Sequence, residues 1–181
     1  YEEFNIGQNN VYRKMNKAVN EALFPNHPYG TQSTIGKGEH LKTPSMEKIH
    51  AYFNTYYVPN NMAIVLAGDF NPDEVVPLIE KHFGNYKTKN VPEWKRPELK
   101  PISEPVVKEV LSKEAESLSM AWRLDGIKSQ EVLICEMMDM VLSNGKVGLI
   151  DLNLKKKQLV GSRTYSYVRP AYDYSYYGMQ G

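Results

Sequence analysis

The sequence lacks the features that identify several classes of protein. A single cysteine, Cys135, excludes an internal disulfide. The 22 basic and 21 acidic residues leave a net charge of +1, so electrostatics favours neither nucleic acid nor a membrane surface as a partner. No apolar run reaches the roughly 20 residues that a membrane span requires. With 41% hydrophobic and 24% charged residues, the composition is that of an ordinary globular protein.

The chain also lacks a catalytic or metal-binding motif with local spacing. None of the four histidines, His27, His40, His50 and His82, stands four residues from another, and none forms His-x-x-Glu-His. Surface or capping roles are the simplest interpretation of these histidines. Serine, aspartate and histidine are present, but no nucleophile-elbow spacing joins them. The residues alone therefore describe an α+β chain without a complete active site.

Helical and strand patterns alternate along the sequence in short segments. Apolar residues at helical spacing predict helices at 11–24, 43–56, 71–84, 129–143 and 147–158. Apolar or alternating runs predict strands at 62–67, 106–111, 117–124, 160–168 and 172–177. This mixture predicts an α+β fold, with a mixed or antiparallel sheet and helices packed on one face.

The stretch from Tyr56 to Gly84 carries the clearest local signals. The apolar run Met62–Ala67 is typical of a strand covered on both faces. Asn71 is a good helix N-cap, and Pro72 suits the first helical position. We therefore predict a strand that delivers a helix back across its own sheet.

Two other helices have predicted caps and faces. Thr43 is predicted to cap one helix, with Pro44 at the first helical position. Ser129 is predicted to cap the helix that ends near Ser143. Four apolar residues of this last helix are expected to face inward: Leu133, Met137, Met140 and Val141.

Prolines divide the chain into two parts. They recur among charged residues at Pro92, Pro97, Pro101 and Pro105. Proline disfavours helix and sheet interiors, so this composition predicts an extended linker over residues 89–105. Residues 1–88 and 106–181 are the two units that the linker joins.

Several short motifs follow one another in a fixed order in the first half of the chain. They are Phe24–Gly30 (Phe-Pro-Asn-His-Pro-Tyr-Gly), Thr34–Gly36 (Thr-Ile-Gly), Tyr56–Tyr57, Pro59–Asn61 (Pro-Asn-Asn) and Ala67–Phe70 (Ala-Gly-Asp-Phe). In this order they resemble the pitrilysin/insulinase family of zinc peptidases, and the large bacterial members most closely. The later half of the chain is similar to the same family more loosely.

The resemblance implies pitrilysin-like, processing-peptidase-like half-domains. Residues 1–88 would be the C-terminal half of a first peptidase-family domain, and residues 106–181 the N-terminal half of a second, homologous domain. Residues 89–105 would be the proline-rich linker between them. We therefore expect an internal fragment of a longer protein, in keeping with a first residue, Tyr1, that is not methionine.

The resemblance also implies a zinc endopeptidase that hydrolyses peptides or unfolded polypeptide segments. Family catalysis uses an inverted His-x-x-Glu-His, whose two histidines bind zinc and whose Glu activates the metal-bound water. A further Glu downstream is the third ligand, and the open fourth position is where the water becomes a nucleophile. The two-histidine motif is absent here and is expected before Tyr1. We therefore expect zinc in the parent protein, and neither bound zinc nor peptidase activity in residues 1–181 alone.

One position matches the third ligand of the family. This ligand lies about two dozen residues before the His-Pro-Tyr-Gly turn, on a Val-x-x-Glu pattern. Glu3 matches it best, and Glu2 is the second choice. Without the resemblance, two adjacent acids are more simply solvated charges. The polar residues Gly7–Asn10 depart from the long helix that carries this ligand in the family.

Two other functions stay open at the level of sequence. The family includes catalytically dead scaffold subunits, which keep the fold and lose the metal ligands. An unrelated α+β protein-binding module is the third alternative, and it would gain support if residues 62–84 lay outside a sheet with helices. Peptide or unfolded protein is the expected substrate, and a second copy or the missing parts of the parent chain would cover uncovered edges. Bacterial cytoplasm and periplasm are both open as locations.

Overall fold

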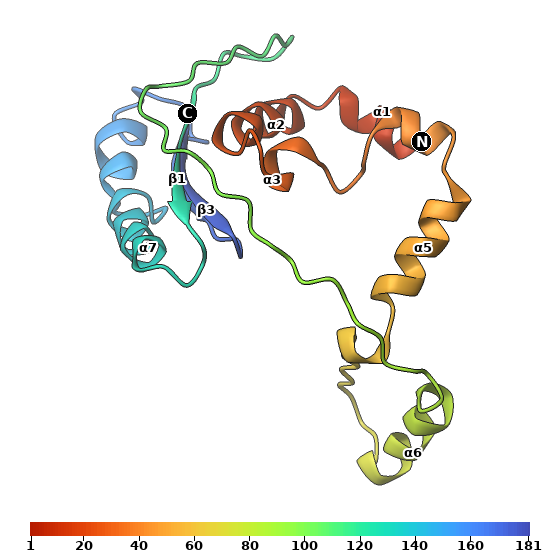
Figure 1. Cartoon of the computed structure of the whole chain (residues 1–181). Helices are drawn as coiled ribbons and strands as arrows, with labels where there is room; N and C mark the ends of the chain where they lie inside the picture. The colour runs from red at the N-terminus through yellow and green to blue at the C-terminus, as the bar shows by residue number, and fades with distance from the viewer. The chain divides into compact units, whose positions relative to one another are not determined.

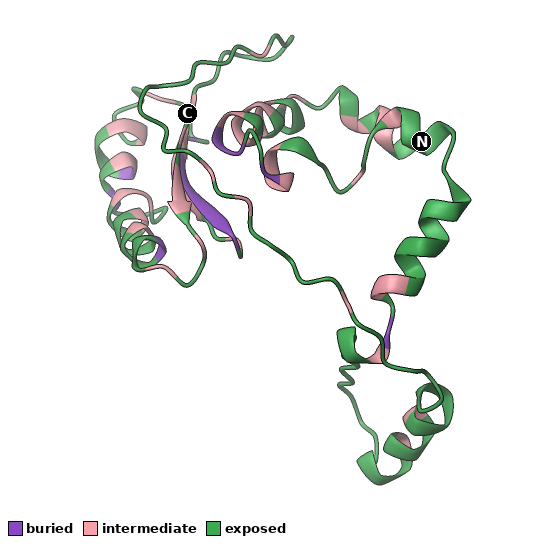
Figure 2. Ribbon diagram, in the orientation of Figure 1, coloured by how far each residue is buried: buried purple, intermediate pink, exposed green.

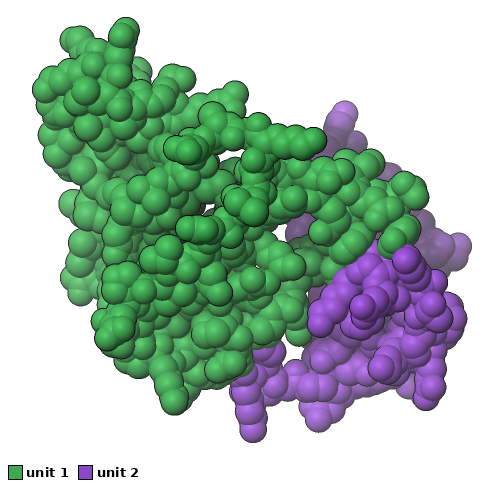
Figure 3. Space-filling model, turned by 90° about the horizontal axis from the view of Figure 1, so that it is seen from above, with its two compact units in different colours: residues 1–36, 96–181 green, residues 37–95 purple.

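The computed structural model describes residues 1–181, which form two compact units. Unit 1 consists of residues 1–36 and 96–181, and unit 2 of residues 37–95, as Figure 3 shows by colour. This division follows contacts within the chain, whereas the division predicted above follows homologous half-domains. The predicted half-domains therefore stay a prediction.

The sheet of unit 1 has three antiparallel strands, β1 (Ser119–Asp125), β2 (Tyr165–Arg169) and β3 (Tyr174–Gln180). Their order is β1–β3–β2, so β3 is the central strand and pairs with β1 on one side and β2 on the other. Tyr177 of β3 lies opposite Trp122 of β1, which defines the register. The predicted α+β fold with an antiparallel sheet is confirmed.

One face of this sheet packs against the end of α2 (Val11–Leu23). Tyr174 and Tyr176 form a buried cluster with Leu23 and Phe24. Successive side chains of a strand point to opposite faces, so these two tyrosines share a face. Figure 2 shows burial concentrated on β3 and at the end of α2.

The opposite face packs against α7 (Gln130–Leu142). Tyr177 is buried there, with its ring 6.0 Å from that of Trp122. Ser166 of β2 donates a hydrogen bond of 2.5 Å to Asp139 of α7. Figure 1 shows the sheet between α7 and α2. Helices therefore pack on both faces of the sheet, whereas the prediction placed them on one face only.

The inward face of α7 differs from the predicted one. Val132 is buried and Cys135 is half-buried, whereas the residues predicted to face inward are 58–69% exposed. These exposed residues are Leu133, Met137, Met140 and Val141. The prediction was wrong because α7 is apolar around most of its circumference, so periodicity does not separate one face from the other.

Side chains satisfy the first N–H groups of α2 and α7 in unit 1. Asn10 and Ser129 accept hydrogen bonds from the first turns of α2 and α7, and the Ser129 cap was predicted. Two short helices complete this unit, α1 (Glu2–Gln8) and α3 (Pro28–Thr31). None of the helices in the chain has the length and apolar character that crossing a bilayer requires.

Asp151 holds the connection between α7 and β2. It opens η2 (Asp151–Lys155), a short π-helical turn at the place where a short helix was predicted. The Asp151 carboxylate accepts hydrogen bonds of 2.8 Å from Lys155 Nζ and from the Gly145 N–H. These bonds, that of Lys155 first, lower the pKa of Asp151 below its ordinary value. Gly145 has a φ of 77°, which glycine adopts without strain.

Unit 2 is built of four helical segments. They are α4 (Gly38–Lys42), α5 (Met46–Tyr56), η1 (Pro59–Asn61) and α6 (Pro72–Phe83). The start of α6 confirms its prediction, since Asn71 Oδ1 accepts from the Asp73 N–H at 3.1 Å. The cap of α5 is Ser45, whose Oγ accepts from the Lys48 N–H at 3.3 Å, so the prediction of Thr43 was wrong.

Two predicted strands are absent. Residues 62–67 and 106–111 form neither strand nor helix. A strand needs a neighbouring backbone to complete its hydrogen bonds, and in unit 1 the central strand β3 provides it for both β1 and β2. An apolar run indicates that a strand would be buried, but it does not supply the partner.

Candidate functional site: the His27–Asp173 junction

The predicted metal ligand Glu3 lies in the first turn of α1. Both Glu3 and its neighbour Glu2 are exposed. No group of three or more His, Cys, Asp or Glu residues in the chain is placed to hold a metal ion. Zinc in a peptidase needs three protein ligands, so the residues of this chain do not fit zinc by themselves.

The four histidines divide into two kinds. His40, His50 and His82 are exposed, which agrees with the surface role predicted for them. His27 instead has no exposed surface. It is a capping residue, as its Nδ1 accepts a hydrogen bond from the N–H of Tyr29 at the start of α3. Its burial was not predicted.

His27 is joined to Asp173, which lies on the connection between β2 and β3. The His27 Nε2 and the Asp173 Oδ2 are 3.0 Å apart, and Asp173 is only 4% exposed. Because Nδ1 already accepts from Tyr29, the ring carries its proton on Nε2 and donates it to the carboxylate. The result is a buried hydrogen bond to a charged acceptor between residues that are far apart in the sequence.

Asp173 is held through its backbone as well. Its N–H donates to the Tyr29 hydroxyl at 3.3 Å, and its carbonyl accepts from Arg96 Nη1 at 3.0 Å. The same Arg96 nitrogen lies 2.8 Å from Asp125 Oδ1. The pKa of Asp125 is lowered by the N–H of Gly126 first and then by Arg96. Segments from three parts of unit 1 thus meet at one loop.

Phe24 and Gly30 complete the packing of this junction. Phe24 is 1% exposed, and its ring makes an edge contact with Tyr29 at 5.7 Å between centroids. A Cβ atom on Gly30 would lie 2.2 Å from the Phe24 carbonyl oxygen and 2.7 Å from that of Asn20. The His-Pro-Tyr-Gly turn therefore has a structural explanation, in which His and Tyr make polar bonds and Gly permits close backbone approach.

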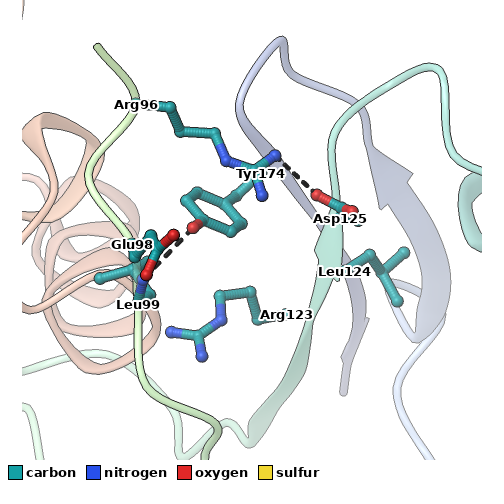
Figure 4. Close-up of a pocket in the computed structure, with 7 residues that line it drawn as sticks. All are labelled: Arg96, Glu98, Leu99, Arg123, Leu124, Asp125 and Tyr174. Atoms are coloured by element: carbon teal, nitrogen blue, oxygen red, sulfur yellow. Dashed lines mark hydrogen bonds and ion pairs between the residues drawn. The ribbon is translucent and has the colours of Figure 1, made fainter.

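A shallow hollow of about 390 Å³ adjoins the junction, and Tyr174 forms its centre (Figure 4). The Arg96 guanidinium carbon lies 4.3 Å from the centroid of the Tyr174 ring. The tyrosine hydroxyl donates to the Pro97 carbonyl at 3.1 Å and accepts from the Leu99 N–H at 3.3 Å. Part of the proline-rich segment is thereby bound to the sheet.

Arg123 of β1 joins this hollow to α2. Its Nη1 donates to the carbonyl of Leu23 at 2.8 Å, and its Nη2 donates to the carbonyl of Lys100. A cation at the C-terminal end of a helix is favourable for the helix dipole. The hollow contains no nucleophile and no metal-ligand set, so its chemistry is that of an anchor.

Sequence reasoning missed the residues that complete this junction. No local motif identifies Asp173, Arg96 or Arg123, and Asp173 is 146 residues away from His27 in the sequence. The only available signal in the sequence was the His-Pro-Tyr-Gly turn. This motif indicates a family, but it does not show which residues the His and Tyr side chains contact.

The comparisons with known proteins agree with the family resemblance seen in the sequence. Residues 45–181 match the family model described as the M16 peptidase inactive domain. An uncharacterized zinc protease of Mycobacterium leprae is 34% identical over 64 residues, which cover 35% of this chain and 14% of that protein. The zinc protease PqqE of Helicobacter pylori is 23% identical over 145 residues, which cover 78% of this chain and 32% of the relative. The chain thus spans less than a third of these relatives.

Two solved structures share the fold. A crystal structure of a protease from Helicobacter pylori has a TM-score of 0.66 at 21% identity, covering 85% of this chain and 38% of that one. The ferredoxin protease FusC in complex with Arabidopsis ferredoxin also has a TM-score of 0.66, at 16% identity, covering 96% of this chain and 20% of that one. The family model covers residues 45–181, which is most of the chain. The chain therefore belongs to the M16 peptidases, the pitrilysin family, and residues 45–181 match their inactive-type domain.

Proposed function

We propose that the chain is a non-catalytic part of a zinc metalloendopeptidase that hydrolyses peptides or unfolded polypeptide segments. The family match over residues 45–181 carries this proposal, and the zinc proteases among the relatives support it. The relative solved with ferredoxin has a protein bound to it, which agrees with a polypeptide substrate. The chain contributes scaffold and one metal ligand, and the remaining ligands come from the inverted His-x-x-Glu-His of the parent protein.

Glu3 is the ligand that this chain supplies in the proposal. It is exposed at the start of α1, and the helix lies about two dozen residues before the His-Pro-Tyr-Gly turn, as the family pattern requires. The Glu3 carboxylate forms no hydrogen bond or ion pair within the chain, so it is available to a metal. α1 ends at Gln8, which makes the ligand helix shorter than the resemblance implies.

The proposal keeps the half-domain division, with residues 1–88 from one homologous domain and 106–181 from the next. One family model matches residues 45–181 across the proline-rich residues 89–105, so the match marks no boundary there, and the division rests on the resemblance of each half to the family. Tyr174 binds residues 97 and 99 of that segment, so the linker is anchored at its centre.

The chain alone is expected to be inactive. A single carboxylate does not hold zinc at micromolar concentrations against a chelator, because structural and catalytic zinc sites use three or four protein ligands. The measurement combines zinc titration by calorimetry with cleavage of a fluorogenic unfolded peptide by residues 1–181. Zinc-dependent cleavage that a chelator abolishes would contradict the proposal.

The role of Glu3 is tested in the longer protein that includes the upstream zinc motif. Glu3→Gln is expected to lower zinc affinity by roughly 100-fold or more, because a ligand is lost from a three-ligand site. Glu2→Gln is the matched control, since it removes the same charge from the neighbouring position on the same helix and should change affinity less than about threefold. Equal effects of the two substitutions, or a larger effect at Glu2, would remove Glu3 from the site.

A scaffold subunit of the same family is the second candidate function. The match to the inactive-type domain favours it. The two functions differ in the parent protein, which holds stoichiometric zinc if it is the peptidase and none if it is the scaffold. The third alternative, an unrelated α+β module, gains from the absence of a strand at 62–67, but the family match over residues 45–181 outweighs it.

A further inference from the structure

Unit 1 is assembled from two stretches of the chain, residues 1–36 and 96–181, which the whole of unit 2 separates in the sequence. The first stretch meets the sheet through residues 23–30, the end of α2 and the His-Pro-Tyr-Gly turn, which we call the docking turn. The second stretch receives the docking turn at four residues, which we call the sheet site: Arg123, Asp173, Tyr174 and Tyr176. With one cysteine in the chain, no disulfide joins the two stretches.

The apolar part of this contact is the side chain of Phe24, which is 1% exposed. The centroid of its ring lies 6.4 Å from that of Tyr174 and 6.3 Å from that of Tyr176. Leu23 belongs to the same buried cluster. Buried aromatic residues of this kind are the anchors that dominate the affinity of interfaces between separate chains. Phe24 thus occupies the sheet site as the anchor of a bound peptide would.

Hydrogen bonds cross the contact from three groups of the docking turn. His27 Nε2 donates to the Asp173 carboxylate at 3.0 Å, and the Tyr29 hydroxyl accepts from the Asp173 N–H at 3.3 Å. The Leu23 carbonyl accepts from Arg123 Nη1 at 2.8 Å. The ring of His27 also meets that of Tyr174 edge-on, at 5.4 Å between centroids. Together with the Phe24 ring, these contacts select the pattern Phe-x-x-His-x-Tyr.

The docking turn is held in shape by bonds within its own stretch. His27 Nδ1 accepts from the Tyr29 N–H at 3.1 Å, which fixes the orientation of the imidazole. The His27 carbonyl accepts from the Thr31 hydroxyl at 3.1 Å. Pro28 at the first position of α3 restricts the backbone between the histidine and the tyrosine. The turn therefore presents its side chains without help from the sheet.

The sheet site is likewise held in shape by its own stretch. Arg96 Nη1 donates to the Asp173 carbonyl at 3.0 Å. The Tyr174 hydroxyl donates to the Pro97 carbonyl and accepts from the Leu99 N–H. Two surfaces that are each organised beforehand lose less entropy when they associate. The contact therefore has the construction of a binding site and its ligand.

We propose that the sheet site is a recognition site for a helix end that carries the pattern Phe-x-x-His-x-Tyr, and that it binds the docking turn without needing the covalent connection through unit 2. The aromatic residues of the site select the phenylalanine, and the Asp173 carboxylate selects the histidine. In this chain the docking turn is the ligand, and its function is to join the stretches that precede and follow unit 2. The inference concerns contacts within this chain, so it is independent of any metal.

The first test cuts the complete chain within unit 2. A recognition sequence for a site-specific protease is inserted between Pro92 and Glu93, which are exposed and lie in neither helix nor strand. After cleavage, the pieces before and after the cut should elute together from a size-exclusion column at micromolar concentration, because each carries one side of the contact. Separate elution of the two pieces would overturn the proposal.

The second test adds synthetic peptides of residues 11–32 to the cut chain, so it requires no variant of the chain to fold. The natural peptide should displace the N-terminal piece. A peptide with His27→Ala should need at least about tenfold more for the same displacement, because the buried Asp173 carboxylate loses a hydrogen-bond donor. A peptide with Asn26→Ala is the matched control, since Asn26 is the exposed neighbour, and it should act within about threefold of the natural peptide. No displacement by the natural peptide, or equal displacement by the His27→Ala peptide, would contradict a recognition site.

The third test changes the sheet site in the cut chain. Asp173→Ala should weaken the association of the two pieces by at least about tenfold. Asp173→Asn should retain most of it, since the amide oxygen still accepts the His27 Nε2–H. Equal weakening by both substitutions, or no weakening by Asp173→Ala, would overturn the selection of histidine by Asp173. If Asp173→Ala prevents folding, Asp173→Asn and the peptide competition decide.

Discussion

Replacing Gly30 by alanine is expected to lower the free energy of unfolding by about 3 kcal/mol, the upper part of the usual range for overpacking. The added Cβ would lie 2.2 Å from the Phe24 carbonyl oxygen and 2.7 Å from that of Asn20. Both obstacles are backbone atoms, so relief requires α3 to move away from the end of α2. Such a movement would also stretch the hydrogen bond between His27 and Asp173.

Urea unfolding followed by circular dichroism and tryptophan fluorescence measures this loss. Gly161→Ala is the matched control, because nothing lies within 4 Å of a Cβ there and its φ is not positive, so the change should stay within about 0.5 kcal/mol. Gly36→Ala should fall between the two at about 1 kcal/mol, since its φ of 77° strains alanine in open space. A loss at Gly30 no larger than at Gly36 would show that the contact with α2 is not tight.

Replacing Phe24 by alanine is expected to cost about 4 kcal/mol, within the range for removing a buried phenylalanine. The side chain is 1% exposed and packs among aromatic rings. Tyr29 meets it edge-on at 5.7 Å, and Tyr174 and Tyr176 lie at 6.4 and 6.3 Å between ring centroids. These tyrosines are held by the sheet or by hydrogen bonds of their own hydroxyls, so they cannot close the cavity.

The same urea titration measures the loss, and Phe53→Ala of α5 is its control. Phe53 is 54% exposed and stacks on Tyr57, so its removal should cost less than about 1 kcal/mol. An equal loss at the two positions would mean that the cluster around Phe24 is not the core of unit 1. Added xenon or benzene should recover part of the loss at Phe24 if the cavity stays open and dry.

Local chemistry in the sequence was sufficient for the helix starts and for most of the sheet. Asn71 and Ser129 were assigned as caps from residue type alone, because a cap bonds to N–H groups two or three residues ahead. The tyrosine-rich runs near the end of the chain became β2 and β3, since alternation is a property of the strand itself. The predicted cap of α5 was wrong by two residues, because Thr43 and Ser45 are both suitable N-cap residues.

The face of α7 was not decided by its sequence. Leu133 and Met137 are as apolar as Val132, yet only Val132 is buried. A helix that is apolar around most of its circumference can pack through more than one face, and the sheet against which it packs decides which face is buried. Asp139 is part of that choice, since its hydrogen bond with Ser166 places this side of the helix toward β2.

The sequence by itself determined the family, through the order of its motifs, and the class of the fold, through its periodicities. Tertiary structure alone decided that Met62–Ala67 stays unpaired and that His27 meets Asp173. The physical reason is the range of the interactions. Caps and alternation are satisfied within a few residues, whereas a strand ladder or a buried polar pair needs a partner that local sequence does not name. The junction at His27 belongs to this second kind.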